Sequence, residues 1–174
     1  LRIAGSYNII EHVIARNNDD TGISISAKDK DRLLWPAHNL VLNSDSYNNL
    51  DLSGINADGF AAKLGVGPGN IFRGCIAHNN ADDGWDLFNK IEDGPNASVT
   101  IENSVAYENG LPYNKADILK GSIGNGFKLG GEGQPVNHKV INSIAINNNM
   151  DGFTDNFNTG SLIIRNNIAM NNAR

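Results

Sequence analysis

The sequence predicts an all-β fold, a parallel β-helix in which short strands wind into a solenoid. Six segments of about ten residues superimpose, and each ends in a polar pair that is Asn-Asn in five of them. Successive copies of the second Asn lie 31, 31, 29, 39 and 24 residues apart, which is a repeat with insertions of variable length. The chain also holds 28 Asn and 19 Gly, which are turn residues, and no segment keeps a 3.6-residue periodicity.

Each copy of the repeat reads as two or three short strands separated by Asn, Gly and Asp turns. A coil of about 24 residues with short strands and polar turns is typical of a β-helix, whose coils stack about 4.8 Å apart. The competing solenoid, a leucine-rich repeat, would need a leucine spacing and a helical segment that the sequence lacks. Stacked Asn amides can hydrogen-bond from coil to coil, so we interpret the pairs as structural. The six copies are IIEHVIARNN, LVLNSDSYNN, IFRGCIAHNN, TIENSVAYEN, VINSIAINNN and IIRNNIAMNN.

A second element follows the polar pair in the copies ADGFAAKL, DDGWDLFN, GNGFKLGG and MDGFTDNF, and more weakly in DTGISISA. Aligning its glycines places one aromatic residue in the same column of each strong copy, and we expect these rings to stack inside the solenoid. Strand alternation turns the next column outward, towards solvent, and the column after that inward again. The aromatic column is Phe60, Trp85, Phe127 and Phe153, and the outward column is Ala61, Asp86, Lys128 and Thr154.

The alignment also gathers carboxylates that are distant in the sequence. Asp58 is expected one coil from Asp83, with Asp82 beside them in the turn and Asp86 on the same outward face. Carboxylates this close repel each other unless they keep protons or hold a cation. Oxygen ligands in this number suit calcium, whereas zinc is disfavoured because no His or Cys joins them. The alternative is a solvated acidic face without an ion.

Lys128 occupies the column of Asp86 one coil further on. A neighbouring dication would lower the pKa of this lysine and the carboxylates would raise it. Two interpretations therefore remain open from the residues alone: a simple ion pair with Asp86, or a lysine that accepts a proton in catalysis.

The stretch NADGFAAKLGVGPGNIFRGCIAHNNADDGWDLF, followed by GNGFKLGG, resembles the pectate lyases of polysaccharide lyase family 9. The resemblance covers roughly residues 39 to 157. It implies a right-handed, single-stranded parallel β-helix, an acidic polysaccharide substrate (polygalacturonate, or pectate) and cleavage by β-elimination. It also implies an extracellular location in pectin degradation. Four aspartates match the calcium ligands of the family residue by residue: Asp58, Asp82, Asp83 and Asp86.

The same resemblance makes Lys128 the counterpart of the lysine that acts as the Brønsted base, which predicts an alkaline optimum. Lys63, which alternation also turns outward, is our second choice for the base and a contact for a substrate carboxylate. Arg73 and the charged insertion 28–35 are further candidates for contact with an acidic polymer, although the insertion reads more simply as a solvated loop.

Composition limits the other possibilities. A net charge of -5 without a basic patch argues against nucleic-acid binding, and no run of 18 apolar residues predicts a membrane span. The 174 residues predict one domain, 1–174, and we expect a monomer. Because the repeat continues to the last residues, we expect part of a longer helix, without its end coils. The four histidines suggest neither a metal site nor a catalytic triad.

Two other functions remain open from the sequence. A polygalacturonase-type hydrolase is also a β-helix with clustered aspartates, but its carboxylates act on water and need no calcium. A non-catalytic, carbohydrate-binding β-helix would bind without cleavage. Neither of them explains why Asp86 and Lys128 share a column.

Overall fold

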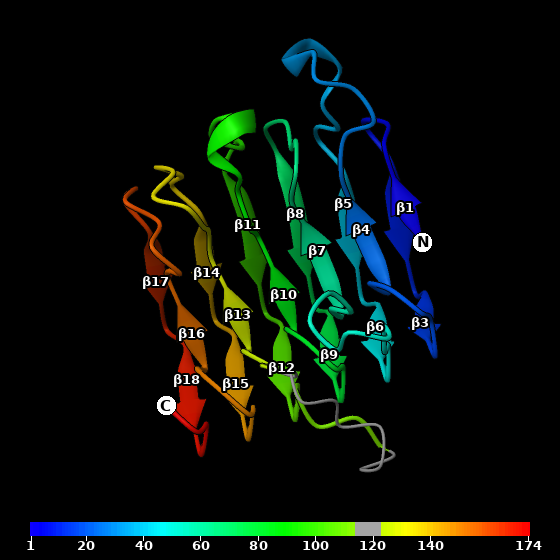
Figure 1. Cartoon of the computed structure of the whole chain (residues 1–174), viewed down its shortest axis with the longest axis vertical. Helices are drawn as coiled ribbons and strands as arrows, with labels where there is room; N and C mark the ends of the chain where they lie inside the picture. The colour runs from blue at the N-terminus through cyan, green and yellow to red at the C-terminus, as the bar shows by residue number, and fades with distance from the viewer. Residues whose placement is uncertain (114–122) are drawn as a thin grey trace.

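The computed structural model, which describes residues 1–113 and 123–174, is a solenoid of three parallel sheets (Figure 1). Each coil contributes one short strand to each sheet, so neighbouring strands of a sheet come from successive coils. The two ends of the chain lie at opposite ends of the stack. The parallel β-helix expected from the repeat is confirmed.

Sheet A carries the second repeated element of each coil, and sheets B and C carry the first. The strands of sheet A are β1 (Arg2–Ile3), β4 (Ile23–Ile25), β7 (Phe60–Ala62), β10 (Trp85–Asp86), β13 (Phe127–Lys128) and β16 (Phe153–Thr154). The strands of sheet B are β2 (Ile9–Glu11), β5 (Leu40–Leu42), β8 (Asn70–Arg73), β11 (Val99–Glu102), β14 (Lys139–Ile141) and β17 (Ile163–Arg165). The strands of sheet C are β3 (Ile14–Arg16), β6 (Asp45–Tyr47), β9 (Ile76–His78), β12 (Val105–Tyr107), β15 (Ile144–Ile146) and β18 (Ile168–Met170).

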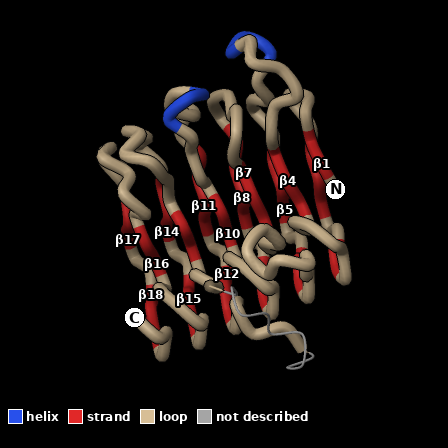
Figure 2. The backbone as a smooth tube through the Cα atoms, viewed as in Figure 1, coloured by secondary structure: helices blue, strands red, loops and turns tan. Residues whose placement is uncertain are grey.

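Helix is confined, among the described residues, to two single turns at one edge of the solenoid (Figure 2). They are the 3-10 turns η1 (Arg32–Leu34) and η2 (Ile91–Asp93). The first belongs to the charged insertion 28–35, where Arg32 stacks over the ring of Trp35. In the part of the chain that is described, no helix has the length and apolar character needed to cross a membrane.

The two residues of each polar pair have different structural roles. The first is in the left-handed backbone region, with φ of 56° at Asn17 and 53° even where Glu108 replaces Asn. Asn tolerates this conformation better than most residues, which explains its recurrence at the corner. The second residue forms a ladder of amide hydrogen bonds, 2.7 to 2.9 Å long, through all six coils. The ladder consists of Asn18, Asn49, Asn80, Asn109, Asn148 and Asn172.

The ladder also satisfies backbone donors that the corner would leave unpaired. From Asn49 onward, each ladder oxygen accepts a second hydrogen bond from the backbone N–H of the Asn in the previous coil, as Asn80 does from Asn49 at 3.2 Å. A second, shorter ladder precedes sheet B and joins Asn8, Asn39 and Asn70. Buried backbone groups are thus paired from coil to coil, and the predicted structural role of the Asn pairs is confirmed.

The aromatic column forms an interior stack, as expected. Neighbouring ring centroids lie 4.8 Å apart from Phe60 to Trp85, from Trp85 to Phe127 and from Phe127 to Phe153. The coil spacing itself sets this distance. The glycine before each ring is needed because a Cβ at Gly84 would lie 2.6 Å from the carbonyl oxygen of Gly126 in the next coil. Close packing between coils therefore holds the second element in register.

Candidate functional site

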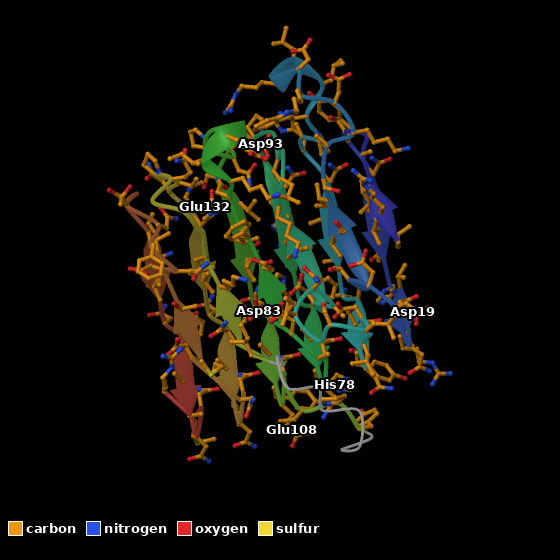
Figure 3. The ribbon with its side chains drawn as sticks, in the orientation of Figure 1. Asp19, His78, Asp83, Asp93, Glu108 and Glu132 are labelled. Carbon is orange, nitrogen blue, oxygen red and sulfur yellow. The ribbon has the colours of Figure 1, made fainter. Side chains whose placement is uncertain are left out.

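The carboxylates singled out by the repeat surround the C-terminal end of β7 and β10 in sheet A. The register pairs Trp85 with Phe60 and Asp86 with Lys128, as the alignment predicted. Asp58 lies one coil before Asp83 and its Oδ1 accepts from the backbone N–H of Asp83 at 3.3 Å. In Figure 3, Asp83 lies near the middle of the solenoid, far from either end.

Three of the four aspartates form a compact group. One carboxylate oxygen from each of Asp58, Asp83 and Asp86 lies within 4.8 Å of the others, close enough to share a metal ion. Asp82 is outside this triad, but it is buried beside it, and its Oδ1 has no hydrogen-bond partner among the described residues. An unpaired buried oxygen next to three convergent carboxylates is what an oxygen-liganded cation would satisfy. The donors present therefore fit a metal ion.

Backbone groups orient the carboxylates of the triad. Asp83 Oδ1 accepts from the backbone N–H of Asn125 at 2.8 Å and from its side-chain amide at 2.7 Å. Asp86 Oδ1 accepts from the backbone N–H of Phe88 at 3.0 Å. Since Asp58 Oδ1 is held in the same way, each carboxylate has one oxygen fixed to the backbone and its Oδ2 left for other partners.

Two lysines occupy those remaining oxygens. Lys63 Nζ lies 2.7 Å from Asp58 Oδ2 and 2.7 Å from Asp86 Oδ2. Lys128 Nζ lies 3.0 Å from Asp83 Oδ2 and 3.5 Å from Asp86 Oδ1, over the face of the Phe88 ring. The carboxylate of Asp86 therefore bridges both ammonium groups.

The expectation that the outward column faces solvent was wrong for Ala61 and Asp86, whereas Lys128 and Thr154 are partly exposed. The side chain of Asp86 points away from the solenoid interior but is only 2% exposed, and Ala61 is fully buried. The lysine side chains close over the column because their ammonium groups pair with Asp86. Alternation sets the side of the sheet to which a side chain points, whereas its exposed fraction depends on the neighbouring side chains that cover it.

Burial and crowding perturb the acidity of the cluster. Burial raises the pKa of Asp58; Lys63 opposes this, Asp86 and Asp83 add to it, and the pKa comes to about 8. Burial and the charge of Asp83 raise the pKa of Asp82 to about 9. Burial acts on Asp86 as well, but Lys63 and Lys128 outweigh it and lower the pKa of that carboxyl. Burial thus favours the protonated forms of Asp58 and Asp82, whereas a cation bound at their oxygens would favour the ionised forms.

The lysines are held in their charged forms by the same carboxylates. Burial alone would lower the pKa of Lys128, but the charges of Asp86 and Asp83 raise it above its ordinary value. Asp58 and Asp86 likewise outweigh the effect of burial and raise the pKa of Lys63. A positive ion bound among these carboxylates would weaken this hold on either lysine.

Arg73 is not part of this cluster. It ends β8 in sheet B and pairs with Glu102 of the next coil, so the structure does not bring it together with the aspartates. The charged insertion 28–35 is also separate, with Arg32 bonded to the carbonyl oxygens of Asp93 and Pro95. The sequence alone did not reveal the joint contact of Lys63 with Asp58 and Asp86.

The cluster lies between two hollows along sheet A. One, of about 870 Å³, reaches Lys63 from the N-terminal coils and includes Arg2, Thr21 and Asn56. The other, of about 530 Å³, reaches Lys128 from the C-terminal coils and includes Phe88 and Phe157. A long ligand lying parallel to the solenoid axis would contact both hollows and pass over the carboxylates.

Residues 1–174 match the family described as the Pel9A-like, right-handed β-helix region. The chain belongs to this family. The family match makes the β-helix right-handed, as the resemblance implied.

Named relatives are enzymes that act on pectate. The chain is 55% identical to the pectate disaccharide-lyase of Dickeya chrysanthemi over 174 residues, which is 99% of the chain and 22% of the relative. It is 49% identical to pectate lyase L of Paenibacillus polymyxa, covering 99% of the chain and 39% of that protein. The crystal structure of pectate lyase Pel9A superimposes with a TM-score of 0.82 at 40% identity, over 94% of this chain and 38% of that one. The chain therefore spans between about a fifth and two fifths of these proteins.

Proposed function

We propose that the protein is a calcium-dependent pectate lyase that cleaves polygalacturonate by β-elimination, with Lys128 as the base. One observation carries the proposal: the carboxylates of Asp83 and Asp86 contact the Lys128 ammonium and also belong to the oxygen triad. A metal-liganding group and a proton acceptor are thus within one coil of each other. The names of the relatives support the substrate class.

The four aspartates would hold the calcium ion, with Asp58, Asp83 and Asp86 converging on it and Asp82 adding its unpaired oxygen. When bound, calcium supplies a Lewis acid that pairs with the uronate carboxylate and makes the proton on C5 more acidic. All other steps are carried by the chain. Its backbone amides keep the carboxylates oriented, and its hollows align the polymer along sheet A.

Lys128 would remove the proton from C5. The electron pair of the C5–H bond forms the C4–C5 double bond, and the C4–O bond breaks with its electrons on the glycosidic oxygen. That oxygen takes a proton from solvent, Lys128 later returns its proton to solvent, and the new non-reducing end is an unsaturated uronide. The step needs no activated water, which distinguishes it from hydrolysis. It does need a neutral lysine, so activity should rise towards alkaline pH.

The test measures cleavage of polygalacturonate by the mid-ultraviolet absorbance of the unsaturated product. We expect activity that is abolished by a chelator and restored by calcium. Lys128→Ala should lose activity by about 10²-fold or more while still binding calcium, as expected for loss of a general base. Lys139→Ala is the matched control, because Lys139 is an exposed lysine on sheet B, away from the cluster.

Each alternative function has its own result in this assay. Reducing ends that appear without absorbance, and that persist with chelator, would establish a polygalacturonase-type hydrolase. Binding of the polymer without cleavage would indicate a carbohydrate-binding β-helix. An acidic optimum with an active Lys128→Ala variant would remove this lysine from the role of base.

Since the proposed substrate is a long polymer, we place the protein outside the cell and expect it to act as a monomer.

A further inference from the structure

Lys63 has contacts that a role as substrate ligand or reserve base does not explain. Its Nζ lies 2.7 Å from Oδ2 of both Asp58 and Asp86, two carboxylates that come from neighbouring coils. The lysine side chain is 18% exposed, while both carboxylates are buried. The ammonium group therefore has two close charged partners within the cluster.

The oxygens that Lys63 occupies are the ones a cation would need. Asp58 Oδ1 is bonded to the backbone N–H of Asp83, and Asp86 Oδ1 to that of Phe88. This leaves the two Oδ2 atoms as the oxygens of these carboxylates that have no backbone partner among the described residues. Ammonium and metal ion would thus compete for the same two atoms.

Charge makes the competition stronger. Asp58, Asp82, Asp83 and Asp86 carry four negative charges when ionised, and Lys63 and Lys128 carry two positive ones, which leaves a net charge of -2. One divalent cation would neutralise that charge. A cation held beside the ammonium of Lys63 would also be repelled by it, and the repulsion falls as the ammonium moves away.

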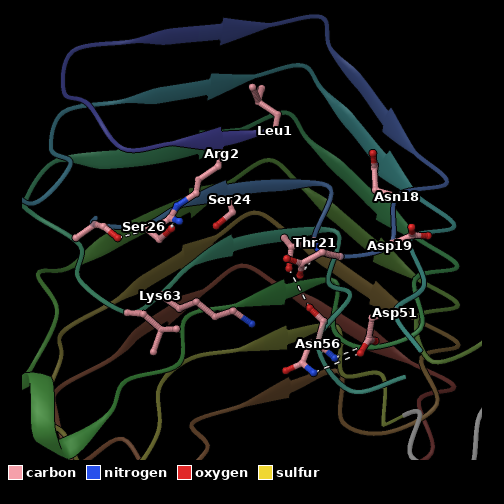
Figure 4. A pocket seen from close by; sticks show the side chains of 13 residues that line it. Leu1, Arg2, Asn18, Asp19, Thr21, Ser24, Ser26, Asp51, Asn56 and Lys63 are labelled. Carbon is pink, nitrogen blue, oxygen red and sulfur yellow. Dashed lines mark hydrogen bonds between the residues drawn. The ribbon is translucent and has the colours of Figure 1, made fainter. Parts of the chain in front are cut away.

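Lys63 borders a space into which it can move. The hollow of about 870 Å³ opens from Lys63 towards the N-terminal coils, and Figure 4 shows the lysine reaching across it in the direction of Thr21. Arg2 lies on the far side and is bonded to Ser26. Among the described side chains lining this hollow, only Lys63 and Arg2 are lysine or arginine, and Asp19, Asp20 and Asp51 add negative charge.

We propose that Lys63 is an internal placeholder for the cation: its ammonium group leaves Asp58 and Asp86 when the cation binds and turns into the N-terminal hollow. There it pairs with a carboxylate of the polymer. Lys63 thereby lowers the affinity for the cation and couples cation binding to substrate binding. The inference rests on the cation site of the proposed function.

Calcium titration calorimetry on the full chain, after treatment with chelator, tests the placeholder role. We expect Lys63→Met to bind calcium at least about fivefold more tightly than the unsubstituted protein, the effect of removing one positive charge about 8 Å from a dication in a water-like dielectric. Lys63→Arg keeps the charge and should stay within about twofold of the unsubstituted protein. Lys139→Met, which removes a lysine on sheet B, should leave the affinity unchanged.

A merely structural role for Lys63 predicts a different pattern. If this lysine only holds the carboxylates in place, Lys63→Met will bind calcium equally well or more weakly, and the placeholder role is refuted. With saturating calcium, the same variant should raise KM for polygalacturonate several-fold with a smaller change in kcat, because it loses a contact with the substrate. An unchanged KM would refute the coupling to substrate.

Chemical labelling of amines in the unsubstituted protein gives a readout that does not depend on a folded variant. We expect calcium to increase the labelling of Lys63, measured by mass spectrometry against Lys139 as internal reference. Unchanged or decreased labelling would overturn the proposal.

The proposed function and the placeholder role of Lys63 fail separately. If the unsubstituted protein binds no calcium, the proposed function fails. If it binds calcium, and either the affinity of Lys63→Met or the labelling of Lys63 fails to increase, only the placeholder role fails.

Discussion

Replacing His138 with asparagine should remove an acid-sensitive element of the fold. His138 precedes β14 and its ring is 1% exposed. Its Nδ1 accepts from the backbone N–H of Val99 at 3.1 Å, and its Nε2 has no hydrogen-bond partner among the described residues. In the three coils before that of Val99 the same position is occupied by the short ladder, where Asn70 Oδ1 accepts from the backbone N–H of Asn39 at 3.0 Å. The histidine thus takes the place of a ladder asparagine.

The structure sets the size and sign of the effect. Burial lowers the pKa of His138 from 6.5 to about 4. Because the folded pKa is below the unfolded one, the stability contributed by the neutral ring is fully present above pH 6.5 and is lost as pH falls towards 4. One pKa unit is worth about 1.4 kcal/mol, so the protein should lose about 2 kcal/mol by pH 5 and about 3 kcal/mol by pH 4 through this group alone.

Urea unfolding at pH 7, 5 and 4 measures this loss. An asparagine at position 138 can accept the hydrogen bond from the backbone N–H of Val99 but does not titrate. As pH falls, the free energy of unfolding of the unsubstituted protein should therefore decrease more than that of His138→Asn. The comparison cancels the contributions of the aspartate cluster, since these are common to both proteins. A pH dependence that is the same in both would refute the assignment of a neutral, buried His138.

Two further substitutions test the packing between coils. Asn80→Ala should cost about 3 kcal/mol or more in urea unfolding, because the backbone N–H of Asn49, its side-chain amide and the carbonyl of Ser46 each lose a buried hydrogen bond. Asn137→Ala, at an exposed position, should cost about 1 kcal/mol or less, and equal costs would contradict the ladder's role. Trp85→Ala should lower the free energy of unfolding by about 3 to 5 kcal/mol. Trp85→Phe should lower it clearly less, because Phe restores the stack and removes an indole N–H that has no hydrogen-bond partner among the described residues. If both variants are equally destabilised, ring stacking is not what Trp85 contributes.

The predicted columns hold because a parallel solenoid leaves little freedom in register. A shift of one residue would turn Trp85 outward and Asp86 inward, and the glycine before the ring would no longer meet the carbonyl of the next coil. The alignment of Gly59, Gly84 and Gly126 therefore predicts which residues are stacked. The same alignment predicts that Asp58 lies beside Asp83 and Asp86 beside Lys128, as they do in the structure.

The contacts of Arg73 do not follow from the repeat. Its place in the repeat does not say what its long side chain will contact, and the structure pairs it with Glu102 on sheet B. His138 is a second example, because a histidine at a ladder position is visible only once the short Asn ladder is seen. In both cases the decisive information is a contact between side chains of different coils.

The repeat predicts the coil order, the interior stack and the proximity of four aspartates and Lys128, because stacked repeats bring equivalent positions of successive coils together. The folded chain adds that Lys63 joins them, that Asp86 is buried under two lysines, and that Asp82 lies beside the triad and outside it. The physical reason is that backbone hydrogen bonds between coils set the register of the strands. Long charged side chains, by contrast, are placed by the charges they meet, which can lie one coil away.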